Sequence, residues 1–118
     1  MTRVLVTGSR DWVDFNLIRS ELEALLEPNN FLTVVHGACP TGADACADLW
    51  AGQNAWINER HPANWQVHGK RAGFVRNHQM VELGADVCLA FIRNGSKGAT
   101  HTADLAEKAG IPVRRFLA

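Results

Sequence analysis

The chain has 118 residues, of which 47% are hydrophobic and 20% are charged, and its twelve basic and twelve acidic side chains give zero net charge. This length and composition predict one globular domain with a hydrophobic core. Zero net charge argues against a protein that coats nucleic acid or an anionic membrane. No apolar run approaches the ~20 residues of a membrane span.

The three cysteines are an odd number and contain no Cys-x-x-Cys pair. This pattern argues against a disulfide framework and against a structural zinc site, and the histidines show no metal-ligand spacing. We therefore expect no bound metal and a cytoplasmic location, also because the N-terminus lacks the layout of a signal peptide. Cys39, Cys46 and Cys88 are expected to be small core residues or loop thiols.

Hydrophobic patterning predicts strands that alternate with amphipathic helices. The strands are expected over 4–6, 32–35, 55–61, 86–92 and 112–116, and the helices over 14–27, 41–50, 73–83 and 100–109. Residues 28–30, with Pro28, are expected to stop the first helix, and Gly84 and Gly110 to stop the last two. Residues 63–72 are expected to form a long functional loop.

Two helix starts carry recognisable capping residues. Asp14 is the expected N-cap of the first helix, and Thr41 that of the second. Asp44 follows Thr41 by three residues, which is the position of the acidic arm of a capping box. Whether Asp44 only caps the helix or also works in a site stays open from the sequence.

Strict alternation of strands and helices predicts an α/β, Rossmann-like three-layer αβα fold with a mostly parallel five-stranded sheet. The polar strand over 55–61 and the proline-containing strand over 112–116 are expected at the edges. In such folds, ligands bind beyond the carboxyl ends of the strands, where the strand order reverses.

The opening stretch, residues 3–12, ends a buried strand in Thr-Gly-Ser-Arg ahead of a helix. A helix N-terminus with a glycine-containing lead-in is a common phosphate site, because its N–H groups are free and its dipole end is positive. Gly8 permits close approach, Ser9 offers a hydroxyl and Arg10 a planar cationic fork. A polar connection without a ligand is the simpler alternative.

Glycines, hydroxyls and cations gather in the loops that should follow the strands, at 7–13, 36–44, 61–72 and 93–99, and in the next helix turns. The loops at the opposite end carry no basic residue. This one-sided distribution suits a phosphorylated small molecule. The candidate ligand-binding residues are Gly8, Ser9, Arg10, Trp12, His36, Gly37, Thr41, Gly42, Lys70, Arg76, Asn77, Ser96, Lys97, Gly98 and Thr100.

Several of these residues have a plain structural alternative. His36 follows a buried strand, where a hydrogen-bonded structural histidine is at least as common as a catalytic one. Trp12 and Trp65 are placed to stack on a base, although packing alone explains each. Cys39 lies near a helix start, where thiolates are favoured, but the sequence places no partner base beside it.

Motifs spread along the chain resemble the YspA-like (cpYpsA-related) branch of the SLOG superfamily. They are residues 8–12, 36–44, 61–65, 68–80, 90–91, 98–100 and 109–113. This resemblance implies a Rossmann-like fold and, as in many small members, binding of a nucleotide or a nucleotide-derived signal such as NAD or an ADP-ribose-like molecule. It also implies frequent homodimers, for which Trp50 and Trp56 are candidate contacts, and an origin in bacteria or their phages.

The superfamily also includes LOG-type phosphoribohydrolases, which release the base from nucleoside monophosphates, and DprA proteins, which process DNA. Arg76 matches the LOG catalytic arginine, whereas Asn77 replaces the lysine beside it. The catalytic glutamate position falls on Thr102 or Ala103, and neither is a carboxylate.

Three hypotheses follow. The first is a nucleotide-binding sensor or sequestering protein without a cofactor. The alternative is an N-glycosidase in which Arg76 and Asp44, or Asp104, are catalytic. A DNA-processing accessory protein is the weakest, because the chain has no long basic stripe.

Overall fold

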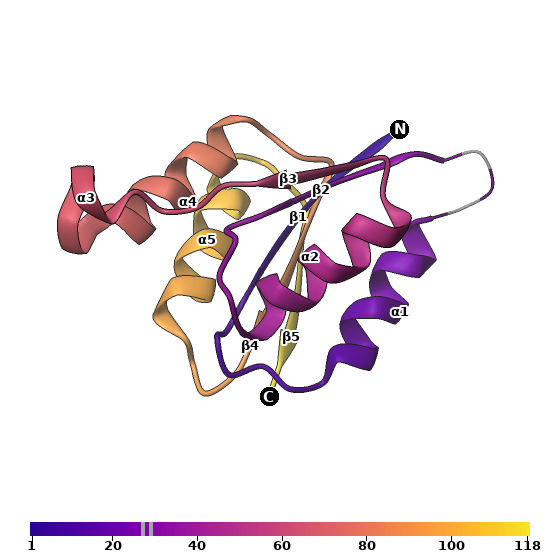
Figure 1. Cartoon of the computed structure of the whole chain (residues 1–118), viewed down its shortest axis with the longest axis horizontal. Coiled ribbons are helices and arrows are strands. Elements are labelled where there is room, and N and C mark those ends of the chain that lie inside the picture. The colour runs from indigo at the N-terminus through magenta and orange to yellow at the C-terminus, as the bar shows by residue number, and fades with distance from the viewer. Residues whose placement is uncertain (27, 29) are drawn as a thin grey trace.

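The computed structural model describes residues 1–26, 28 and 30–118. Its elements alternate as the patterning predicts, and Figure 1 shows them as a twisted sheet covered by helices. In chain order the elements are β1 (Thr2–Gly8), α1 (Phe15–Leu25), β2 (Leu32–His36), α2 (Gly42–Asn54), β3 (Ile57–Arg60), α3 (Trp65–His68), the 3-10 helix η1 (Gly69–Arg71), α4 (Ala72–Glu82), β4 (Val87–Ile92), α5 (Lys97–Lys108) and β5 (Val113–Leu117).

All five strands are parallel, in the order β3-β2-β1-β4-β5. The chain steps from β1 outward to β3, then returns to the other side of β1 to form β4 and β5. The predicted Rossmann-like α/β class is therefore confirmed, and so are the two predicted edge strands. The reversal places the switch point between β1 and β4. In such folds, ligands bind at the carboxyl ends of the strands that flank the switch point.

Helices cover both faces of the sheet. In Figure 1, α1 and α2 lie on one face, and α4 and α5 lie on the other. Val4 and Val6 of β1 pack with the helices of the first face, whereas Leu5 packs with α4 and α5. Because successive side chains of a strand point to opposite faces, a central strand must be apolar throughout, as β1 is.

Two predicted boundaries are wrong. The segment 63–72 is not a loop: Asn64 accepts a hydrogen bond from the backbone N–H of Val67 at 3.1 Å and so caps α3, and η1 leads directly into α4. The last helix begins at Lys97, three residues earlier than expected, so Gly98 lies in its first turn. The expected end of the first helix at Glu27, and Asn29 after it, lie outside the described residues.

The caps were predicted with mixed success. Asp14 caps α1, because its carboxylate accepts from the N–H of Leu17 at 3.2 Å. Thr41 stands at the N-cap position of α2, but its side chain makes no capping hydrogen bond. The capping box is wrong, since the Asp44 carboxylate instead accepts from the backbone N–H of Cys39 at 3.3 Å.

The side chains of Cys46, Cys88 and Trp50 are buried, whereas Cys39 is partly exposed. Burial raises the pKa of the Cys88 thiol to about 12, so this thiol is chemically inert. Trp50 belongs to the core between α1, α2 and the sheet, and it is not available for the predicted dimer contact. In the described part of the chain, no helix has both the length and the apolar character needed to cross a bilayer.

An ion-pair network joins β1 to β3. Arg3 donates from Nη1 and Nη2 to the two carboxylate oxygens of Glu59, at 3.0 and 2.6 Å, and His61 Nε2 lies 2.7 Å from Glu59 Oε2. The hydrogen bonds from Arg3 and His61 outweigh partial burial and hold the pKa of Glu59 at about 2, below its ordinary 4.5. A carboxyl group with a depressed pKa stabilises the fold above its ordinary pKa, and this stability is lost as the pH falls toward 2.

We therefore expect Glu59→Gln to flatten the acid side of the stability profile. The free energy of unfolding should fall less between pH 6 and pH 3 in this variant than in the wild-type protein, measured by urea unfolding. Glu82→Gln, at an exposed position of α4, is the control and should keep the wild-type slope. Equal slopes in all three proteins would contradict the role of the network.

Candidate functional site

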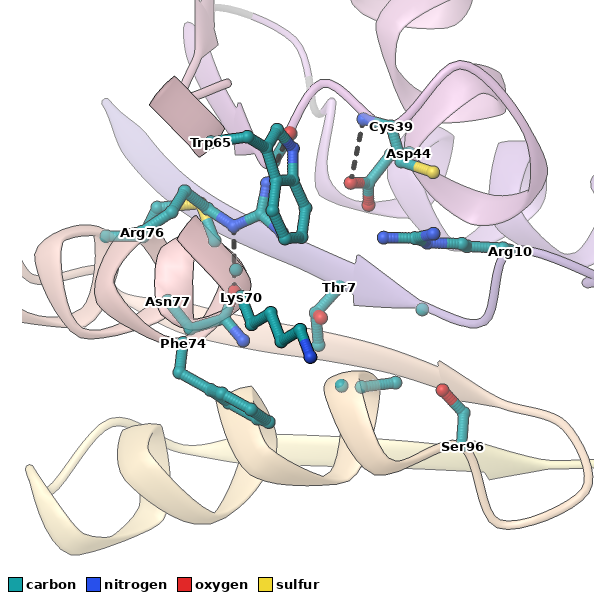
Figure 2. A pocket seen from close by; sticks show the side chains of 16 residues that line it. Thr7, Arg10, Cys39, Asp44, Trp65, Lys70, Phe74, Arg76, Asn77 and Ser96 are labelled. Carbon is teal, nitrogen blue, oxygen red and sulfur yellow. Dashed lines mark hydrogen bonds between the residues drawn. The ribbon is translucent and has the colours of Figure 1, made fainter. Parts of the chain in front are cut away.

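A pocket of about 330 Å³ opens at the carboxyl ends of β1 and β4, where the topology predicts a ligand site. Figure 2 shows side chains from both halves of the chain converging on it. It is lined by Thr7, Gly8, Arg10, Gly37, Cys39, Asp44, Trp65, Lys70, Gly73, Phe74, Arg76, Asn77, Met80, Ser96, Gly98 and Ala99.

Two glycines at strand ends make room for this arrangement. A Cβ atom on Gly37 would lie 2.5 Å from Nη1 of Arg76 and 3.0 Å from Oδ2 of Asp44. A Cβ atom on Gly8 would lie 2.2 Å from the Cβ of Ala43. Glycine at 37 therefore allows a guanidinium and a carboxylate to lie against the same backbone, and glycine at 8 allows α2 to pack close to β1.

Arg76 holds three chain segments together at one wall of the pocket. Its Nη1 donates to the carbonyl oxygens of Gly37, at 2.5 Å, and His61, at 3.3 Å, and its Nε donates to Oδ1 of Asn77 at 2.8 Å. Burial lowers the pKa of Arg76, and the carboxylate of Asp44 counteracts this effect. The guanidinium thus remains a cation that is fixed in position beside the pocket.

Asp44 is a buried carboxylate in the pocket wall, only 7% exposed. Burial raises the pKa of Asp44 above its ordinary value, although the N–H of Cys39 and the charges of His36 and Arg76 oppose this shift. A carboxylate can only accept hydrogen bonds while it is ionised, and it repels anions. This wall therefore suits hydroxyl or amino groups of a ligand and disfavours its phosphates.

The opposite part of the pocket is suited to an anion. Ser96, Gly98 and Ala99 belong to the start of α5, whose first N–H groups have no partner within the helix. A Cβ atom on Gly98 would meet nothing within 4 Å, so this backbone faces open space. In Figure 2 the ammonium group of Lys70 points into the middle of the pocket, and the guanidinium of Arg10 lies near Asp44 and Cys39.

Two aromatic side chains line the pocket from α3 and α4. Trp65 is 52% exposed and Phe74 is 47% exposed, although both are large and apolar. Phe74 packs edge-on against the ring of His101, with 4.7 Å between the ring centroids. Exposed aromatic faces beside a polar pocket are the usual surface on which a planar ring stacks.

Most of the predicted ligand-binding residues converge here. The pocket brings together Gly8, Arg10, Gly37, Lys70, Arg76, Asn77, Ser96 and Gly98, together with the candidate catalytic residue Asp44. Thr41 lines a second hollow of about 360 Å³, which shares Arg10, Gly37 and Arg76 with the first. These residues come from four separate segments, so their convergence is a property of the tertiary structure.

Other predicted residues support the pocket without lining it. Ser9 is buried, and its Oγ accepts from the backbone N–H of Arg93 at 2.7 Å, which ties the ends of β1 and β4 together. Trp12 packs against Phe91 in the core. The N-terminus of α1 does not line the pocket, because α1 begins only at Phe15, whereas Gly8 and Arg10 from the expected anion site do line it.

His36 is a structural residue. It is fully buried; its Nδ1 accepts from the N–H of Ala38 at 3.0 Å, and its Nε2 lies 2.9 Å from Oδ1 of Asn58. Gly42 seats the start of α2 against the backbone of residues 9–10. Lys97 and Thr100 are in the first turn of α5 but do not line the pocket.

Two groups considered for catalysis have different surroundings. Asp104 lies on the outer side of α5 and forms an ion pair with Arg115 at 2.8 Å, away from the pocket. Asp44 is therefore the carboxylate among the described lining residues. The pocket residues that were not among the predicted site residues include Gly73, Phe74 and Met80. Gly73 and Met80 lie three and four residues from Arg76 along α4, and Phe74 lies three residues from Asn77, which is the spacing that marks one helix face.

A five-stranded parallel sheet covered by helices on both faces defines the class of Rossmann-like α/β domains. The model of the "YspA, cpYpsA-related SLOG family" matches residues 2–68. This match covers more than half of the chain, and the chain belongs to that family.

The family match contains Gly8, Arg10, Gly37 and Asp44 and ends before α4 and α5. The whole chain is similar to the Gene 61 protein of Mycobacterium phage D29, with 47% identity over 123 aligned positions that cover 98% of this chain and 97% of that protein. No solved structure gives a significant match.

Proposed function

We propose that this protein binds a nucleotide or a nucleotide-derived small molecule, such as a nucleoside phosphate, NAD or an ADP-ribose-like molecule, and acts as a sensor or sequestering protein. The observation that carries this proposal is the division of one pocket into three chemically different parts. The start of α5 with Lys70 suits a phosphate, Asp44 suits sugar hydroxyls, and Trp65 with Phe74 suits a planar base. Membership in a SLOG family is consistent with such a ligand.

The phosphate end of the proposal depends on two sources of positive potential. A helix N-terminus supplies N–H donors and a partial positive charge, and Lys70 adds a full charge from η1. The open space at Gly98 lets an oxygen approach the backbone closely. These features are independent of base identity, so the affinity for nucleotides should depend chiefly on phosphate.

The sugar end of the proposal depends on Asp44. Its carboxylate can accept hydrogen bonds from the two ribose hydroxyls. The acidic residue of dinucleotide-binding folds binds ribose in the same way. A ligand that lacks one hydroxyl leaves a buried lone pair without a donor, which costs about 1–3 kcal/mol. Ribonucleotides should therefore bind more tightly than deoxyribonucleotides.

Calorimetric titration with AMP, dAMP, adenosine, ADP-ribose and NAD tests the proposal. We expect heat of binding for the phosphate-bearing ribonucleotides and a loss of at least about tenfold in affinity for AMP in Lys70→Gln, since a hydrogen bond to a charged group contributes about 1.5–3 kcal/mol. Lys108→Gln removes the same charge at the far end of α5 and should bind like the wild type.

The titrations test the assignment of Asp44 separately from the proposed function as a whole. Equal affinity of AMP and dAMP would contradict the assignment of Asp44 to the ribose. Absence of heat and of any thermal shift with every compound at millimolar concentration would overturn the proposed function as a whole.

A second candidate function is N-glycosidic cleavage of a nucleoside monophosphate. It is favoured by one observation, the raised pKa of a buried carboxyl group that lines the pocket together with Arg76. A carboxyl group with a raised pKa is a better general acid than an ordinary one, and general acid–base catalysis is what this reaction requires. Chromatography of the same titration samples detects released base; release that is lost in Asp44→Asn would favour the hydrolase, and no release at high protein concentration would exclude it.

A further inference from the structure

A chain of hydrogen bonds leads from the pocket to the interface between α4 and α5. The Nε of Arg76 donates to Oδ1 of Asn77 at 2.8 Å, and Nδ2 of Asn77 lies 3.3 Å from Nδ1 of His101. Asn77 is 5% exposed, so water does not compete freely for its amide. The three side chains thus form one connected unit across two helices.

The chemistry of the first member determines the protonation state of the last. A guanidinium has five N–H donors and no acceptor, so the atom of Asn77 that faces Arg76 must be its oxygen. The amide NH₂ of Asn77 therefore faces His101 as a donor. His101 can accept this hydrogen bond only if Nδ1 carries no proton, which requires the neutral ring protonated at Nε2.

The surroundings of His101 favour the neutral ring. Burial lowers the pKa of His101, the nearby His78 lowers it further, and Asp104 on the same helix raises it. The ring contacts Phe74 edge-on, and His78 approaches from α4 with 5.4 Å between ring centroids. From β5, Arg115 is held in ion pairs with Asp104 and Glu107.

We infer that Asn77 and His101 are positioning residues, which hold the guanidinium of Arg76 at the pocket as long as His101 is neutral. Protonation of Nδ1 would set a donor against the amide NH₂ of Asn77. The amide would then have to rotate, which would turn its NH₂ toward the Nε–H of Arg76. The expected consequence for ligand affinity rests on the proposed function, whereas the tautomer and the titration of His101 do not.

The first test uses the protein without ligand. In ¹⁵N-histidine spectra, assigned with His101→Gln, His101 should be the Nε2–H tautomer at pH 7.5. In Asn77→Asp, the carboxylate lies between Arg76 and His101 and can accept hydrogen bonds from both. Because it stabilises a protonated Nδ1 of His101, the pKa of His101 should rise by at least about one unit. An Nδ1–H tautomer in the wild type, or an unchanged titration in Asn77→Asp, would overturn the inference.

The second test measures the affinity for ADP-ribose, whose diphosphate does not titrate between pH 5.5 and 7.5. Affinity should fall severalfold as the pH is lowered through this range in the wild type. His101→Leu removes the acceptor and should be weak at both pH values, whereas His101→Gln supplies a carbonyl acceptor that does not titrate and should restore affinity with a flat profile. His78→Gln removes a neighbour that lowers the pKa of His101, so the fall in affinity should move to a higher pH in this variant.

The two tests separate the possible failures. Absence of ADP-ribose binding at any pH would count against the proposed function, and the spectra would still decide the state of His101. Binding that is equally strong at pH 5.5 and 7.5 in the wild type, with the expected tautomer, would overturn the positioning role.

Discussion

Replacing Gly42 with alanine is expected to lower the free energy of unfolding by about 3 kcal/mol or more, the sum of a strained backbone and an overpacked contact. Gly42 has φ of +69°, in the left-handed region. Its missing Cβ would lie 2.2 Å from the backbone oxygen of Ser9 and 2.6 Å from the carbonyl group of Arg10. These are backbone atoms, so no side-chain rotation relieves the clash.

Two other glycines separate the cost of the strained backbone from the cost of the overpacked contact. Gly110 also has positive φ, +82°, but a Cβ there meets nothing within 4 Å, so Gly110→Ala should cost about 1 kcal/mol for the backbone alone. Gly52 lies in the same helix as Gly42 with open space around it, and Gly52→Ala should stabilise the protein by about 0.5–1 kcal/mol. Urea unfolding of the three variants measures their free energies of unfolding and so tests this order. A cost for Gly42→Ala no larger than that for Gly110→Ala would contradict the close approach of α2 to residues 9–10.

Replacing Arg76 with methionine is expected to lower the affinity for the proposed ligand at least about 30-fold and to lower the free energy of unfolding by about 2–4 kcal/mol. The change removes the hydrogen bonds to the carbonyl oxygens of Gly37 and His61 and to Asn77. It also removes one of the charges that stabilise the buried carboxylate of Asp44. Calorimetric titration and urea unfolding measure the two effects.

The loss of Arg76 should also change the pH dependence of stability. Without the guanidinium, the pKa of Asp44 rises further above its ordinary value. A carboxyl group with a raised pKa stabilises the fold most at low pH, and this contribution is lost as the pH rises through the raised pKa. Arg76→Met should therefore lose stability between pH 4 and pH 7 more steeply than the wild type.

A double mutant and two single variants test this explanation. Adding Asp44→Asn to Arg76→Met removes the buried charge that has lost the Arg76 guanidinium and should recover part of the stability at pH 7. Arg76→Lys keeps the charge without the planar fork and should be intermediate in affinity. Arg19→Met, on the exposed face of α1, should leave both properties unchanged. A double mutant that is less stable than Arg76→Met at pH 7 would show that the two side chains do not interact as described.

Local patterning accounts for most of the fold. The apolar run over residues 4–6 marks the central strand because a strand between two neighbours must be apolar on both faces, and Asp14 marks the start of α1 because its carboxylate caps a free N–H. The short helix α3 was missed because its only local signal is the single capping residue Asn64.

The pocket residues also divide into those that local sequence signals predicted and those that depend on packing. Periodicity and residue chemistry along the chain were enough to predict the class of fold and the end of the sheet at which polar groups gather. They also marked Arg10, Lys70, Arg76 and Gly98 as candidates. The folded structure was needed to show that the start of α5 faces the pocket while that of α1 does not, that Ser9 and His36 are buried supports, and that Asn77 joins Arg76 to His101. Burial, hydrogen-bond partners and pKa shifts depend on contacts between segments far apart in sequence, and these contacts are set by how the helices pack on the sheet.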